Sequence, residues 1–184
     1  GHIYHALIND QNAAGLLKKT GIFGFDVLPA GQSLAGATVE LVSMDERESR
    51  LKKVLNSVRT NYDFILVDCP PSLGLLTING LAAAEKVIIP VQCEYFALEG
   101  LGKLLNTIKI VQSRLNPELQ IEGILMTMYD SRLRLCNQVV AEVTSPTPEL
   151  RIAGLIDGRY HLRVRAGNAQ GLEGLRRCFV SSQH

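Results

Sequence analysis

An acidic residue with a distinctive setting, Asp68, follows the apolar run Phe64–Val67 and stands just before a pair of prolines. An apolar strand that ends in Asp places a carboxylate at the edge of an α/β sheet where ligands bind. In a nucleotide-hydrolysing site such a carboxylate steers Mg²⁺, usually through a bound water. The structural alternative is a buried strand-end Asp that caps the next helix. Both readings predict that Asp68 ends a central strand.

The segment after Asp68 combines residues that restrict the backbone conformation with a glycine that does not. Pro70 and Pro71 limit the backbone to a few conformations, whereas Gly74, shortly after Ser72, restores freedom. This combination suits a loop with two discrete states that depend on a bound phosphate group. The alternative is a rigid loop that leads into the next helix.

Cysteine and histidine offer no second reactive centre. Cys69 has no His or basic residue near it in sequence that would lower its thiol pKa, so we expect a small buried residue. The other three cysteines are far apart, without a CxxC or Cys/His cluster, and read as free thiols in a reducing compartment. The four histidines have no carboxylate spacing that supports a metal or acid/base role.

Periodicity predicts the elements that position Asp68. Apolar runs predict strands, and apolar residues at helical spacing predict helices. Strands that alternate with helices imply a mostly parallel sheet with right-handed crossovers. We expect strands at 25–29, 63–68, 86–91 and 121–128, and helices at 33–42 (capped by Ser33), 45–59, 73–84, 97–115 and 132–143.

Composition indicates an ordinary globular protein. The 184 residues are 46% hydrophobic and carry a formal net charge of +1, so the whole molecule has no strong pull toward nucleic acid. No apolar run approaches the length needed to cross a membrane, and no signal peptide opens the chain. We therefore expect a cytoplasmic protein.

Four segments in a fixed order resemble the ParA/Soj family of DNA-partitioning ATPases. They are VLPAG…LAGATVEL, LVDCPPSLGLLTINGL, VIIPVQCEYFALEGL and LNPELQIEGILMTMYDSRLRL. The resemblance runs from about Gly1 to Val143. It implies a P-loop NTPase-like fold, an α/β architecture in which helices flank a mostly parallel sheet.

The family's Gly-rich phosphate loop, a deviant Walker A segment, has no counterpart in this sequence. The nearest imitation, 99–104, has Ala97 where the first Gly would stand and Leu104 where Ser or Thr would stand. We therefore expect a fragment that lacks the P-loop strand, the first helix and switch I. Because that strand is central in the family, the strand ending at Asp68 should then expose a hydrogen-bonding edge, making the fragment marginally stable or oligomeric.

The resemblance assigns roles around Asp68. It implies that Asp68 is the Walker B carboxylate, an indirect Mg²⁺ ligand acting through water. It also implies that Pro70, Pro71, Ser72 and Gly74 form switch II.

Further roles follow at two later strand ends. Gln92 and Glu94, with Tyr95, should line the same crevice as Asp68, near the nucleotide or in a dimer face; loop hydrogen bonding is the alternative. The resemblance also places Met128 and Tyr129 beside the nucleotide base.

Two arginines after the third buried strand, Arg132 and Arg134, are candidates for contact with the DNA backbone. The alternative is that both are solvated surface arginines that precede a helix.

The region 144–184 departs from the family, with six arginines, five glycines and no lysine after residue 149. We expect this region to be either a divergent or out-of-frame tail or an unusual extension. Its arginines could bind nucleic acid through phosphate contacts, and the alternative is a solvated, poorly ordered end.

The resemblance thus predicts an incomplete ATPase domain at 1–143 and an atypical tail at 144–184. In the intact family, ATP and Mg²⁺ are the cofactors, the homodimer binds DNA without sequence preference, and a ParB-like centromere-binding protein stimulates hydrolysis. We expect a fragment of such a chromosome- or plasmid-partitioning ATPase, nucleoid-associated and inactive alone. The alternative is a non-catalytic binding or scaffold module that has lost ATP turnover.

Overall fold

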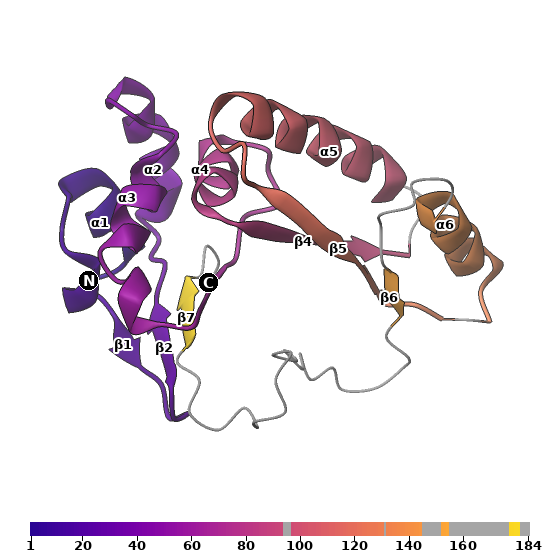
Figure 1. Ribbon diagram of the computed structural model, residues 1–184, viewed down its shortest axis with the longest axis horizontal. Helices are drawn as coiled ribbons and strands as arrows, with labels where there is room; N and C mark the ends of the chain where they lie inside the picture. The colour runs from indigo at the N-terminus through magenta and orange to yellow at the C-terminus, as the bar shows by residue number, and fades with distance from the viewer. Residues whose placement is uncertain (94–96, 131, 145–151, 155–176, 181–184) are drawn as a thin grey trace. The chain divides into compact units, whose positions relative to one another are not determined.

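The structure is a computed structural model that describes residues 1–93, 97–130, 132–144, 152–154 and 177–180. Its contacts divide the chain into two compact units, Gly1–Ala84 with Arg165–His184, and Glu85–Val164. Figure 1 draws the elements of both units. The boundary between residues 143 and 144 stays a prediction.

The first unit surrounds a small sheet with short helices. Its strands are β1 (Lys18–Lys19), β2 (Phe25–Leu28), β3 (Phe64–Val67) and β7 (Arg177–Val180). Its α-helices are α1 (Ile3–Asn9), α2 (Leu34–Glu40), α3 (Arg50–Asn56) and α4 (Leu75–Ala83). Three 3₁₀ turns complete it, η1 (Ala13–Gly15), η2 (Leu41–Ser43) and η3 (Arg59–Asn61).

The sheet of the first unit has the order β1-β2-β7-β3. β1 is antiparallel to β2, whereas β7 is parallel to both of its neighbours. The register runs from Phe25↔Arg177↔Phe64 to Leu28↔Val180↔Val67. β3 is the last strand in this order, so its second edge has no partner among the described strands, as expected for the strand before Asp68, whereas β7 pairs with its first edge in parallel. That partner comes from the C-terminal region, whose pairing no local pattern could reveal.

An aliphatic core holds this unit together. Leu51, Leu55 and Val58 recur at helical spacing and are all buried. They pack with α1, α2 and the inward residues of the sheet, including Leu28 and Val180. Burying a side chain of this size stabilises the fold by about 1.5–3 kcal/mol. The apolar stripe of α3 thus fixes the helical layer against the sheet.

The second unit is a three-stranded parallel sheet with two helices. It comprises β4 (Lys86–Gln92), α5 (Ala97–Arg114), β5 (Gln120–Thr127), α6 (Arg134–Thr144) and β6 (Ile152–Gly154), with strand order β4-β5-β6. β4 pairs with β5 from Lys86↔Gln120 to Gln92↔Thr127, with a register shift after Val87. Its buried residues are mostly aliphatic or sulfur-containing, among them Ile89, Val91, Ile108, Val111, Ile124 and Met126.

The predicted α/β class is confirmed, and most predicted elements appear within a few residues of their expected ends. The helix predicted at 45–59 is shorter, since only Arg50–Asn56 is α-helical before Ser57. Ser33 stands at the start of α2 but makes no side-chain capping bond, so the predicted cap is wrong; its hydroxyl lies 3.4 Å from Nε2 of His2. Within the described ranges, no helix is long and apolar enough to span a membrane.

Candidate functional site

Asp68 lies immediately after β3, at the carboxyl end of the two parallel strands β3 and β7. Its backbone N–H donates a 2.8 Å hydrogen bond to the carbonyl oxygen of Val180, the last residue of β7. The register of four paired residues leads directly to this bond. The position of the Asp68 backbone is therefore set by β7 as well as by β3.

A small cavity of about 30 Å³ opens beside Asp68. Its lining is mostly aliphatic and comes from α1, α2, α3, α4 and the ends of β3 and β7. Besides Asp68 it includes Leu7, Leu51, Val67, Cys69, Asn79 and Val180. A space of this size holds one or two water molecules. Asp68 and Asn79 provide the polar side chains of this lining.

The loop after Asp68 is tied to the helix that follows it. The buried hydroxyl of Thr77 donates to the carbonyl of Ser72 at 2.5 Å, with the carbonyl of Pro70 at 3.4 Å. Gly74 stands just before α4 with an extended backbone that any residue can adopt, and a Cβ there would have ordinary contacts. The freedom of Gly74 is thus not needed for the observed conformation, and the two-state loop stays a prediction.

Cys69 is held in a close-packed position against α4. A Cβ on Gly80 would lie 2.5 Å from the Cys69 sulfur, so only glycine allows this approach. Burial, and then the neighbouring charge of Asp68, raises the pKa of the Cys69 thiol to about 11. The expectation of a small, largely buried, unreactive cysteine is supported by this setting. The three cysteines with described side chains, Cys69, Cys93 and Cys136, are all free thiols.

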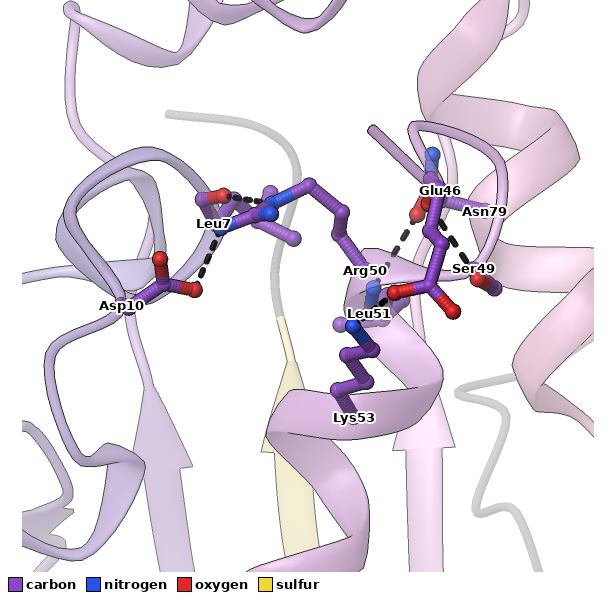
Figure 2. Close-up of polar contacts among 8 residues, drawn as sticks. All are labelled: Leu7, Asp10, Glu46, Ser49, Arg50, Leu51, Lys53 and Asn79. Atoms are coloured by element: carbon purple, nitrogen blue, oxygen red, sulfur yellow. Dashed lines mark hydrogen bonds and ion pairs between the residues drawn. The ribbon is translucent and has the colours of Figure 1, made fainter. Parts of the chain in front are cut away.

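Asn79 joins α4 to the beginning of α3, as Figure 2 shows in part. Its side chain is 1% exposed. It accepts a 3.0 Å bond from the N–H of Leu51, and its amide donates to the carbonyls of Arg47 at 2.7 Å and Leu75 at 3.0 Å. The side chain therefore satisfies three backbone groups at once, close to the Asp68 cavity.

Arg50 makes the corresponding link from α3 to α1 (Figure 2). Its buried guanidinium donates through Nε to the carbonyl of Leu7 at 2.5 Å and pairs through Nη2 with Asp10. Leu7 is at the same time a lining residue of the cavity. Asn79 and Arg50 together make a chain of polar contacts through three helices behind Asp68, which the sequence reasoning missed.

In the second unit, the predicted residues gather at the carboxyl ends of β4 and β5. Gln92 is exposed and pairs in register with Thr127, so Met128 follows at the same edge. Met128 has a left-handed backbone (φ 54°) and is 69% exposed. The Tyr129 hydroxyl donates to Oδ1 of Asn137 at 2.8 Å. Glu94 and Tyr95 lie outside the described residues, and the crevice expected to join Gln92 with Asp68 stays a prediction.

The two candidate DNA-contacting arginines have different surroundings. Arg132 donates through its guanidinium to both oxygens of Asp130 and through its backbone N–H to one of them. These bonds hold the pKa of the Asp130 carboxyl at about 2, so the pair is ionised at neutral pH. Arg134, exposed at the start of α6, is the less constrained candidate.

A metal held directly by a cluster of side chains is not indicated in the part of the chain that the structure describes. No group of three or more His, Cys, Asp or Glu side chains converges there.

Comparison with known proteins decides the family. A family model described as an AAA domain (AAA_31) matches residues 1–121. The chain is 54% identical over 141 residues to the sporulation initiation inhibitor protein Soj of Bacillus subtilis, covering 77% of this chain and 56% of that protein. It is also 54% identical over 143 residues to the chromosome partitioning protein ParA of Myxococcus xanthus, covering 78% and 50%. The chain belongs to the ParA/Soj family.

Solved structures share the fold of this chain. A cobyrinic acid a,c-diamide synthase from Mycobacterium smegmatis, solved with bound ADP and magnesium, is 40% identical with a TM-score of 0.75, covering 81% of this chain and 60% of that one. A plasmid partition protein from Borrelia burgdorferi, 21% identical with a TM-score of 0.71, covers 82% and 62% and shares the fold. The ParA/Soj chain spans about half the length of the curated relatives it matches.

Proposed function

We propose that this chain is part of a chromosome- or plasmid-partitioning ATPase in which Asp68 faces Mg²⁺ through water. The observation that carries the proposal is the position of Asp68 at the carboxyl end of two parallel strands, with its backbone bonded to Val180. The similar protein of known structure that binds ADP and magnesium supports the same ligand class.

The loop formed by Pro70, Pro71, Ser72 and Gly74 would then report the state of the nucleotide. Thr77 connects this loop to α4, and Asn79 connects α4 to α3. A change in the loop would therefore move a helix that is bonded to its neighbours rather than an isolated segment. This connection supports the proposal that the loop is a switch segment.

The described residues do not by themselves fit Mg²⁺-ATP. The cavity of about 30 Å³ is far below the roughly 300 Å³ of a small-molecule site. Its lining carries one carboxylate and no Lys or Arg that could contact phosphates. We propose that the chain alone does not turn over ATP, because the Gly-rich phosphate loop of the family has no counterpart in its sequence.

The remaining predictions belong to the same proposal. A homodimer would form with Gln92, Glu94, Met128 and Tyr129 near the nucleotide or the dimer face. Arg132 and Arg134 would contact DNA without sequence preference, and a ParB-like protein would be the partner on the nucleoid in the cytoplasm. The relatives named for chromosome partitioning support this assignment.

A second candidate function is a non-catalytic binding or scaffold module. The specific observation in its favour is the same small aliphatic cavity, which offers no phosphate contacts. Such a module would keep the family's helices and sheets while lacking nucleotide turnover.

Calorimetric titration of the chain with Mg²⁺-ATP tests whether Asp68 belongs to a nucleotide site. Asp68→Asn keeps the shape of the side chain and removes its charge, and Asp45→Ala at an exposed position is the matched control. Micromolar binding that weakens at least tenfold in Asp68→Asn alone supports a nucleotide site at Asp68. Absence of heat with the wild-type chain would mean that the missing phosphate loop is essential and that the chain alone is an inactive fragment or a binding module.

A further inference from the structure

Two buried cysteines meet in the second unit although 43 positions separate them in the sequence. Cys93 directly follows β4, and Cys136 lies in the first turn of α6. They are only 6% and 2% exposed. The Cys136 thiol donates a weak hydrogen bond to the carbonyl oxygen of Cys93, with the sulfur 3.8 Å from that oxygen. The two cysteines, here called the thiol pair, therefore lie against each other inside one unit.

The surrounding backbone holds both members of the thiol pair in place. The N–H of Cys93 donates to the carbonyl oxygen of Thr127 at 3.3 Å, which ties Cys93 to the end of β5. Asn137, the neighbour of Cys136, accepts a 2.8 Å hydrogen bond from the hydroxyl of Tyr129. Both cysteines are thus positioned by the carboxyl ends of β4 and β5 and by the loop that follows β5.

The thiol pair suits a reaction between two sulfurs. In the described part of the chain no third His, Cys, Asp or Glu side chain joins it to form a metal-binding group, whereas protein zinc sites use three or four such ligands. A disulfide needs only two cysteines whose side chains already approach each other. Burial, and then the Cys136 thiol beside it, raises the pKa of the Cys93 thiol to about 11, so little of its thiolate is present at neutral pH. The pair should therefore stay reduced until an oxidant is sustained.

We propose that Cys93 and Cys136 are a redox modification site, which a peroxide converts into a reversible disulfide. One sulfur, as its thiolate, attacks an oxygen of hydrogen peroxide and becomes a sulfenic acid, while the hydroxide that leaves takes up the thiol proton as water. The other sulfur then attacks the sulfenic sulfur, which forms the S–S bond and releases a second water. Two thiols lose two electrons in total, and one peroxide is reduced to two waters. A dithiol reductant reverses the step by thiol–disulfide exchange.

The bond fastens the first turn of α6 to the carboxyl end of β4. Gln92 precedes Cys93 at this edge, and Tyr129 is already bonded to Asn137 of α6. The proposed function places Gln92 and Tyr129 near the nucleotide or the dimer face, so oxidation would restrict the motion of that region. This consequence rests on the proposed function, whereas formation of the disulfide does not.

Peroxide treatment of the folded full chain, followed by peptide mapping, tests the proposal. The chain is exposed to about 1 mM hydrogen peroxide, the remaining thiols are alkylated, and a digest without reductant is analysed by mass spectrometry. We expect a linked 93–136 peptide that disappears after treatment with dithiothreitol. The same oxidation in denaturant is the reference, because Cys69 is closer to Cys93 in sequence and shorter loops close more readily in an unfolded chain. The ratio of 93–136 to 69–93 links should be at least about tenfold higher in the folded chain.

Variants and a second measurement separate the site from incidental oxidation. Cys136→Ala should abolish the link to Cys93, and Cys69→Ser is the matched control that should keep the 93–136 link. In the linked form, amide exchange in α6 should slow by at least about tenfold relative to β2 of the first unit, because the closed loop restricts local opening.

Three results would overturn the proposal. They are a 93–136 link no more abundant than in denaturant, oxidation of either cysteine to sulfinic acid without a link, and unchanged exchange of α6 in the linked form. The measurements contain no nucleotide, so their failure is distinct from a failure to bind ATP.

Discussion

Replacing Asn79 by alanine should destabilise the first unit strongly for a single polar substitution. The change removes three hydrogen bonds and leaves the buried N–H of Leu51 without its acceptor. An unsatisfied buried donor costs about 1–3 kcal/mol, and the lost side-chain atoms add a small cavity. We expect a total of about 2–4 kcal/mol in the free energy of unfolding.

Amide hydrogen exchange at Leu51 is the appropriate assay, because the chain has two units and a single denaturation curve need not be two-state. If Leu51 exchanges through opening of the first unit, its protection should fall about 30- to 1000-fold, since each 1.4 kcal/mol is a factor of ten. Amides of β5 in the second unit serve as the internal reference. Asn56→Ala, an exposed asparagine of α3, should change stability by less than about 0.5 kcal/mol.

Asn79→Asp provides a stricter test of the same reasoning. The carboxylate keeps an acceptor for Leu51 but directs an oxygen at the carbonyls of Arg47 and Leu75, where the amide donated. Burial and these carbonyls should raise the pKa of the new carboxyl, so the loss is present at neutral pH and shrinks as acid protonates it. Stability of Asn79→Ala within about 0.5 kcal/mol of wild type would refute the role given to this side chain.

Three further predictions concern the packing and ionisation of the first unit. Gly80→Ala should cost about 1–3 kcal/mol in thermal unfolding despite the better helix propensity of alanine, and Cys69→Ala should relieve much of that cost because the clash is with the Cys69 sulfur. Alkylation of Cys69, followed by peptide mass spectrometry, should be at least about 100-fold slower at pH 8 than alkylation of an exposed thiol. The rate should increase toward pH 10, because the thiol pKa is raised to about 11. Rapid labelling at pH 8 would contradict this expectation. For Asp26, burial alone would raise the carboxyl pKa, but hydrogen bonds from Lys19 and Tyr62 outweigh it and hold the pKa below 3.8. Its stabilising contribution is therefore present above pH 3.8 and lost as the pH falls through the lower folded-state value. Asp26→Asn should make the free energy of unfolding less dependent on pH in that acidic range. An unchanged pH dependence would argue against this role of Asp26.

Local sequence signals predicted the elements whose burial follows from their own residues. The run Phe64–Val67 before Asp68 has the apolar continuity of a strand, and the apolar spacing in 97–115 predicted α5 nearly to its ends. The alternation of strands with helices predicted a parallel sheet, and β4 pairs with β5 in parallel. Such features depend on neighbours that are close in sequence.

Features that depend on distant pairings were beyond this reasoning. β7 follows residues rich in arginine and glycine, and the sequence of Arg177–Val180 does not indicate that β2 and β3 are its neighbours. Asn79 reads as an ordinary polar residue of an apolar helix until α3 is placed against it. Asparagine in the middle of an otherwise apolar helix is the signal that could have marked it, because a buried amide must find backbone partners.

The position of β7 has a consequence for synthesis on the ribosome. β2 and β3 are translated before the second unit, whereas the strand that joins them is translated only after that unit. At about 5–20 residues per second, the interval between β3 and β7 is on the order of 5–20 s. During that time the nascent first unit presents two facing strand edges and part of its aliphatic core to the surrounding solution. Chaperone occupancy on translating ribosomes should therefore be highest in the window between completion of β3 and completion of β7.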